Sequence, residues 1–136
     1  MTRKKIRENV FTLLFRLDFY DRQDLDEQIE LFFEDIPNAQ EEEKKLIRDS
    51  FFGVLDKQEE IDEKIAACAD GWKLKRIAKA DLTIMRLAVY EMCFDENVPE
   101  KVAINEAVEL AKLYGGDKTP GFVNAILAKV SQLAGE

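Results

Sequence analysis

Positions 115–122 read GGDKTPGF and combine the residue types that build an anion site at a helix start. Gly115 is expected to take the left-handed conformation that ends the preceding helix. Thr119 is expected to cap the next helix with its hydroxyl, with Pro120 at the first helical position. The free amides would then face solvent beside Lys118, where oxygen-rich anions bind. Phe122, at the edge of the buried face, could stack on a base.

A second basic feature is the N-terminal arm, which consists of Arg3, Lys4, Lys5 and Arg7. Residues 1–20 hold five basic and two acidic side chains, whereas residues 21–63 hold five basic and sixteen acidic ones. Residues 64–136 hold ten of each, and the formal net charge of the chain is −8. A polyanion would therefore be repelled by the middle of the chain and attracted only locally.

Both features also have a plain structural interpretation. Capped helix starts are common in proteins without any ligand there, and Asp117 disfavours an anion at this one. A basic N-terminus is often only a solvated surface. Taken alone, the residues leave two interpretations open at each place: an RNA or phosphate site, or ordinary structure.

The residues needed for common catalytic and metal sites are missing. The chain has no histidine, the commonest general base and metal ligand, and its two cysteines, Cys68 and Cys93, are far apart in sequence. No GxGxxG, Walker or GxSxG motif occurs. Carboxylates are plentiful, but they lie in long acidic runs typical of solvated helix faces. We therefore expect neither an enzyme nor a bound cofactor or metal.

Length and composition predict one globular domain over residues 1–136. Hydrophobic residues make up 46% of the chain and charged residues 35%, which excludes a disordered class. Charged residues interrupt every apolar run well before the ~18 residues that a membrane span requires. The N-terminus has no uniform apolar stretch of the kind found in signal peptides. With no cysteine pair, a reducing cytoplasm is the expected location.

Apolar residues recur at steps of three and four along most of the chain, which predicts an all-α protein. We expect about seven helices in two packed subbundles. Their approximate positions are residues 3–20, a short acidic helix ended by Pro37, two helices within 41–69 that meet near Gln58, and then 78–94, 99–114 and a last helix from 119 onward.

Two polar or aromatic residues stand out against this helical pattern. Residues 78–94 are apolar on nearly all faces, so Arg86 within them would be buried and would need a partner such as Glu106 or Glu91. Trp72 lies in a break of the pattern and is expected to plug the core or a hinge.

Three segments of the sequence carry recognisable motifs: WKLKRIAKADLTIMRLAVYEM and VPEKVAINEAVELAKLYGGDKTPGFVNAIL within residues 72–127, and RKKIRENVFTLLFRLDF at the N-terminus. Together they resemble the NusB family of transcription antitermination factors. The family pattern has a Trp, an Arg-Ile, an acidic residue and Arg-Leu-Ala-x-Tyr-Glu. Pro-x-x-Val-Ala-Ile-Asn-Glu-Ala and Phe-Val-Asn follow. The resemblance implies an all-helical fold in two parts, no catalysis, and binding of the boxA segment of nascent RNA.

The resemblance also implies a protein partner and a set of contact residues. The partner is NusE, the ribosomal protein that doubles as an antitermination factor. Through NusE the protein would join the RNA polymerase complex during ribosomal RNA transcription. The implied RNA-binding residues are Arg3, Lys4, Lys5 and Arg7 in the first helix, and Lys112, Tyr114, Lys118, Thr119 and Phe122 near the last helix. The implied NusE-facing residues are Phe15 and Asp81.

Two other functions stay open at this stage. The chain could be a protein-binding module whose main ligand is NusE, with the RNA read mostly by the partner. It could also be an accessory domain of an RNA methyltransferase, although no cofactor-binding βα units follow. The family that the sequence resembles includes both monomers and homodimers, and the sequence does not decide between them.

Overall fold

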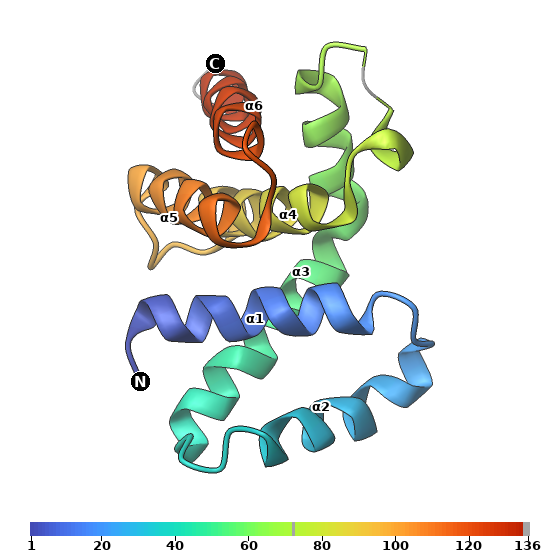
Figure 1. The fold of residues 1–136 in the computed structure, drawn as a ribbon, viewed down its shortest axis with the longest axis vertical. Coiled ribbons are helices and arrows are strands. Elements are labelled where there is room, and N and C mark those ends of the chain that lie inside the picture. Colours follow the sequence, from blue (N-terminus) through green and yellow to red (C-terminus); the bar gives the residue numbers. More distant parts are fainter. Residues whose placement is uncertain (72, 135–136) are drawn as a thin grey trace. The chain divides into compact units, whose positions relative to one another are not determined.

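The structure, a computed structural model, describes residues 1–71 and 73–134, and Trp72 therefore lies outside it. Within the described ranges the regular elements are all helical (Figure 1), which confirms the all-α prediction. They are α1 (Arg3–Leu17), η1 (Arg22–Asp24), α2 (Leu25–Glu34), α3 (Glu41–Cys68), η2 (Leu74–Arg76), α4 (Lys79–Phe94), α5 (Glu100–Tyr114) and α6 (Thr119–Ala134). The chain divides into two compact units, Met1–Gly53 and Val54–Glu136.

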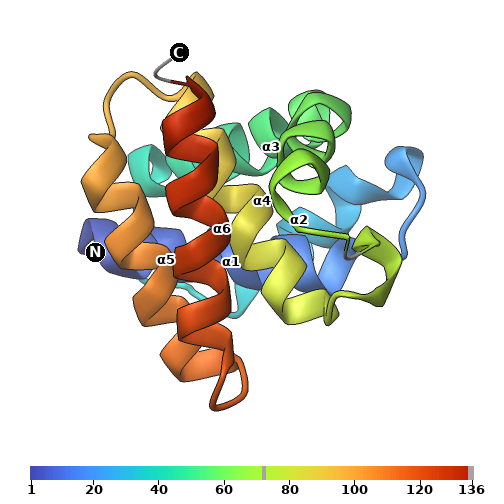
Figure 2. The ribbon, with the colours of Figure 1, turned by 90° about the horizontal axis from the view of Figure 1, so that it is seen from above.

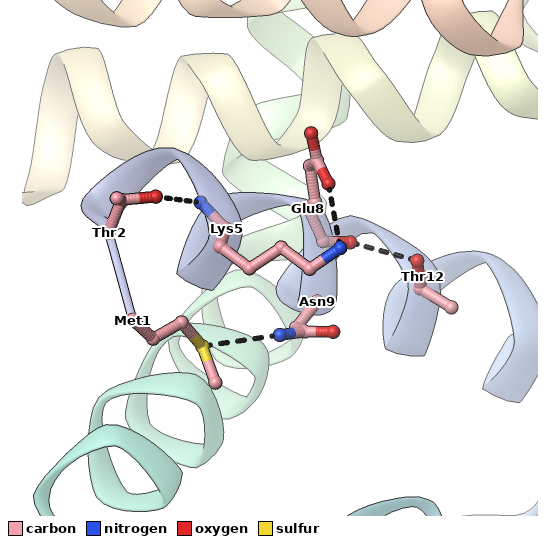
Figure 3. A network of polar contacts seen from close by, with 6 residues as sticks. All are labelled: Met1, Thr2, Lys5, Glu8, Asn9 and Thr12. Atoms are coloured by element: carbon pink, nitrogen blue, oxygen red, sulfur yellow. Dashed lines mark hydrogen bonds and ion pairs between the residues drawn. The ribbon is translucent and has the colours of Figure 1, made fainter. Parts of the chain in front are cut away.

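In the first unit, α1 begins with side-chain capping. The Thr2 hydroxyl accepts a hydrogen bond from the backbone N–H of Lys5 at 3.1 Å, which satisfies one of the free amides of the first turn (Figure 3). The Lys5 ammonium lies 3.4 Å from the carboxylate of Glu8, and the Thr12 hydroxyl donates to the Glu8 carbonyl at 2.8 Å (Figure 3). These local bonds order the basic end of α1.

The long helix α3 corrects the expected helix count. Residues 41–68 form one helix of 28 residues, where two helices meeting near Gln58 were expected. The buried side chains of α3 follow steps of three and four, and Gln58 takes its turn on the same face, half-buried. A single polar residue on an apolar stripe removes no backbone hydrogen bond, so the helix continues through it. The described residues therefore form six α-helices rather than about seven.

In the second unit, α4, α5 and α6 pack against one another in all three pairs (Figure 2). Arg86 on α4 makes a two-pronged ion pair with Asp62 on α3, with Nε–Oδ1 and Nη2–Oδ2 distances of 2.8 and 2.9 Å. A charge partner for Arg86 was expected, but Asp62 was not among the candidates. No helix in the described part of the chain combines the length and the apolar character needed to cross a membrane.

The start of α3 contains a carboxylate with a lowered pKa. Glu43 accepts a hydrogen bond from the backbone N–H of Gln40 at 2.8 Å, and its other oxygen pairs with the amino group of Met1. The Gln40 amide, followed by the Met1 amine, lowers the pKa of Glu43 below its usual 4.5. The folded state therefore binds this proton less tightly than the unfolded state. The ionised carboxylate stabilises the fold above 4.5, and that contribution is lost as the pH falls through the folded-state pKa.

We therefore expect Glu43→Gln to lower the thermal midpoint at pH 7, and the difference from the wild type to disappear in acid. Thermal unfolding followed by circular dichroism between pH 7 and pH values well below 4.5 measures this. Glu42→Gln, a change of the same charge at the exposed neighbouring position, is the control. A difference between Glu43→Gln and wild type that stays constant over the pH range would contradict the assignment.

Candidate functional site

A hollow of about 470 Å³ lies in the second unit, between the segment that leads into α4 and the loop that joins α5 to α6. It combines an apolar surface with two cations and two carboxylates. Its lining residues are Arg76, Ile77, Ala78, Asp81, Gly116, Asp117, Lys118, Thr119 and Phe122. Four of them, Asp81, Lys118, Thr119 and Phe122, are residues that the sequence pointed to. The fold therefore brings together positions that are about forty residues apart in the chain.

Thr119 is oriented differently from the expected helix cap. The first helical hydrogen bond of α6 runs from the Phe122 N–H to the Lys118 carbonyl at 3.1 Å, and Thr119 is the first residue of the helix. The Thr119 hydroxyl turns back into the loop, where it accepts from the Gly116 N–H at 3.0 Å. It donates to the carboxylate of Asp81, with distances of 3.1 and 3.2 Å to the two oxygens. The expected capping role of Thr119 is therefore wrong.

The expectation for Gly115 is also wrong, for a related reason. Gly115 has φ −100° and ψ −176°, which is extended backbone open to any residue. A Cβ atom at Gly115 would lie 2.5 Å from the Cβ and Cγ2 atoms of Thr119. Glycine is needed here because the Thr119 side chain packs against its backbone. The left-handed conformation plays no part.

Only part of the predicted row of free amides is present at the start of α6. The Thr119 N–H donates to the Gly116 carbonyl at 3.1 Å, the Phe122 N–H is used within the helix, and Pro120 has no N–H. A carboxylate of the protein itself already lies at this helix start, because Asp81 accepts a hydrogen bond from the Thr119 hydroxyl. A carboxylate at a helix N-terminus is favoured by the helix dipole. The binding capacity of the hollow therefore rests mainly on its side chains.

Lys118 and Phe122 are the predicted residues best placed to meet a ligand. Lys118 is exposed, and Phe122 is half-buried on the rim of the hollow, as expected for a residue at the edge of the buried stripe. Arg76 is exposed in the segment that leads into α4, also lines the hollow, and was missed in the sequence. The segment KLKRIAKAD could have indicated Arg76, because its cations directly precede a buried helix. Asp81 is half-buried and lines the hollow.

The other predicted residues lie outside the lining of this hollow. Lys112 and Tyr114 are exposed in the last turn of α5, and the ammonium of Lys112 is 3.2 Å from the carboxylate of Glu109. In the first unit, Phe15 is 37% exposed and its ring stacks on that of Phe11 at 5.9 Å.

Within the N-terminal arm, three of the four basic residues are open to solvent. Arg3, Lys4 and Lys5 are exposed, whereas Arg7 is only 9% exposed and has contacts within the protein. Because Arg7 is buried, its side chain mainly makes contacts within the protein. The accessible basic charge of the arm is thus concentrated in its first three residues.

The cysteines contribute no reactive centre. Burial is the main cause that raises the pKa of both the Cys68 and the Cys93 thiols. A thiol with a raised pKa supplies little thiolate, which is the nucleophilic form.

The hollow has exposed cations beside an apolar surface, on segments that join packed helices. This arrangement is that of a helical binding protein.

Comparison with known proteins identifies the family. Residues 4–132 match the NusB family. The transcription antitermination protein NusB of Agathobacter rectalis is 50% identical over 129 residues, covering 95% of this chain and 98% of that protein. The solved structure of T. maritima NusB is 32% identical with a TM-score of 0.84, covering 97% of this chain and 92% of that chain. The chain belongs to the NusB family, whose members are transcription antitermination factors.

A more distant structure adds support for the fold alone. It is a crystal structure of the antitermination factors NusB and NusE in complex with double-stranded RNA, 22% identical with a TM-score of 0.82 and covering 96% of both chains.

The packing of Thr119 against Gly115 generates a stability prediction. We expect Gly115→Ala to destabilise the protein by about 1–3 kcal/mol, because the new methyl group forces Thr119 or the loop to move. Gly116→Ala is the matched control, since a Cβ there would meet only the Thr119 Oγ1 atom, at 4.0 Å. Urea unfolding of both variants measures the difference. Equal stability of the two variants would contradict the close packing.

Proposed function

We propose that this NusB family member binds boxA-type single-stranded nascent RNA together with the ribosomal protein NusE. Through this complex it joins the RNA polymerase antitermination complex in the cytoplasm, during ribosomal RNA transcription. No catalysis, cofactor or metal is part of the proposal. The observation that carries it is the hollow of the second unit, which places Lys118 and Arg76 around an apolar surface with the half-exposed ring of Phe122.

The chemistry of the hollow suits a nucleotide. Lys118 and Arg76 can hold phosphate oxygens, and an aromatic ring offers a stacking surface to any base. Asp81 and Asp117 can accept hydrogen bonds from the N–H groups on base edges. A ligand that is anionic at one end and a hydrogen-bond donor at the other fits two cations and two carboxylates better than a simple polyanion does.

The basic arm provides a second group of proposed RNA contacts. Arg3, Lys4 and Lys5 are exposed near the start of α1 and carry the positive charge of an otherwise acidic chain. We place Lys112 and Tyr114, both exposed at the end of α5, in the same group. Arg7 and Thr119 are buried, so we assign them supporting rather than contacting roles. For NusE, the proposed contacts are Phe15 and Asp81.

One observation favours a second candidate function. Burial of Arg7 and Thr119 leaves fewer side chains for RNA, as expected if NusE is the main ligand and the partner reads most of the RNA. The two functions differ in the isolated protein. A boxA RNA titration without NusE gives salt-sensitive binding under the first function and none under the second.

The arm generates a prediction about salt dependence. We expect the double variant Lys4→Ala/Lys5→Ala to weaken RNA binding and to flatten its dependence on salt. Each lost phosphate contact lowers the log–log slope by about 0.7 for a single strand. The measurement is the dissociation constant of a boxA oligonucleotide over a range of salt concentrations.

Lys45→Ala/Lys57→Ala is the charge-matched control for the arm. These lysines lie on the acidic helix α3, paired with Asp49 at 2.7 Å and Glu60 at 3.8 Å. Both double variants change the net charge equally, so an effect of overall charge would appear in both. An arm variant with the slope of the wild type would show that the arm is only solvated surface. Thermal stability should change little, because exposed charges contribute little to it.

Phe122 generates a prediction about stacking. We expect Phe122→Leu to keep most of the stability, since it stays apolar, and to lose about 1–3 kcal/mol of RNA binding through the missing aromatic face. Phe122→Ala should lose binding and, because the ring is half-buried, some stability as well. RNA titration and urea unfolding separate the two effects. Undiminished RNA binding by Phe122→Leu would refute the stacking role.

A further inference from the structure

The Thr119 hydroxyl connects α4 to the loop between α5 and α6. It donates its single proton to the Asp81 carboxylate and accepts the N–H of Gly116 at 3.0 Å. These bonds form a relay from backbone amide to hydroxyl to carboxylate, in which each bond polarises the next. One end of the relay is the proposed NusE-facing carboxylate. The other end is the loop that carries Lys118 and leads to Phe122.

The relay is enclosed by the packing around it. Thr119 is 6% exposed, and its side chain leaves no room for a Cβ atom at Gly115. The hydroxyl therefore has few alternative rotamers, and the position of the loop and that of the carboxylate depend on each other. Asp81 is only half-buried and lines the hollow, so a ligand can approach it from there.

We propose that the Asp81–Thr119–Gly116 relay couples partner binding to RNA binding, with Asp81 and Thr119 as positioning residues. The inference rests on the proposed function. A carboxylate has about four lone-pair sites, so it can accept the Thr119 hydroxyl and a cationic side chain of NusE together. A cation on Asp81 fixes the carboxylate, and the relay then orders the loop before RNA arrives. The entropic cost of ordering the loop on RNA binding is then smaller, and the affinity for RNA rises.

The test is a binding cycle with Thr119→Val, which removes the hydroxyl and keeps the shape. The RNA affinity is measured with and without NusE, and the NusE affinity with and without RNA, because coupling between two sites is reciprocal. We expect NusE to raise the RNA affinity of the wild type by a factor of roughly 5 to 150, the usual range of such coupling. In Thr119→Val the factor should fall toward one while NusE still binds. Thr119→Ser, which restores the hydroxyl, should restore the factor.

Thr83→Val is the matched control. Thr83 is also a buried threonine, and its hydroxyl donates to the Lys79 carbonyl of its own helix at 2.7 Å, away from the relay. It should keep the full coupling factor. The same factor in Thr119→Val as in the wild type would overturn the inference and leave the proposed function intact. A wild type that binds no RNA, with or without NusE, would overturn the proposed function itself.

A second measurement needs no variant and so does not depend on how Thr119→Val folds. Hydrogen exchange of the Gly116 amide reports the relay directly, because that amide donates to Thr119. Adding NusE without RNA should slow its exchange several-fold, while the Lys5 amide, bonded to Thr2 in the first unit, reports any general change. Gly116 exchange that NusE leaves unaltered would refute the relay.

Discussion

The contact of Thr119 with Gly115 and Asp81 determines the shape of the surface that the second unit offers to ligands. It joins the end of α5, the start of α6 and the first turn of α4 through one small side chain. The absence of a Cβ atom at Gly115 leaves room for the Thr119 side chain, and the Asp81 carboxylate fixes the orientation of the Thr119 hydroxyl. If the hydroxyl or the carboxylate is lost, a polar group of this contact loses its hydrogen-bond partner, which costs about 1–3 kcal/mol. The positions of Lys118 and Phe122 follow from this contact.

Local charge, rather than net charge, decides how such an acidic protein can meet RNA. Lysines of α3 form ion pairs with carboxylates of the same helix, as Lys44 does with Glu41 and Lys45 with Asp49. Such pairs neutralise each other at short range and contribute little else. At physiological salt, charges more than about 8 Å away are largely screened. An exposed lysine or arginine beside an apolar hollow therefore acts on a phosphate almost independently of the acidic middle of the chain.

Periodicity predicted most of the helices because it depends only on neighbours along the chain. The buried stripe of α6 and the half-exposed position of Phe122 follow from spacing alone. What the sequence could not provide are partners distant in sequence. Asp62 and Arg86 are 24 residues apart, and Asp81 and Thr119 are 38 apart. Gly115 shows the same limit, because its requirement comes from a side chain packed against it, whereas its own dihedral angles suit any residue.

The family resemblance and the structure answer different questions about a site residue. Resemblance assigns a position to a binding region, whereas burial decides whether the side chain there can reach a ligand. Arg7 and Thr119 fall within regions that resemblance marks for RNA, and both are buried. Thr119 nevertheless matters for that region, because its hydroxyl fixes the loop that presents Lys118. A residue can therefore be required for RNA binding only because it positions other residues. Its substitution would alter the RNA affinity although the residue itself does not touch the RNA.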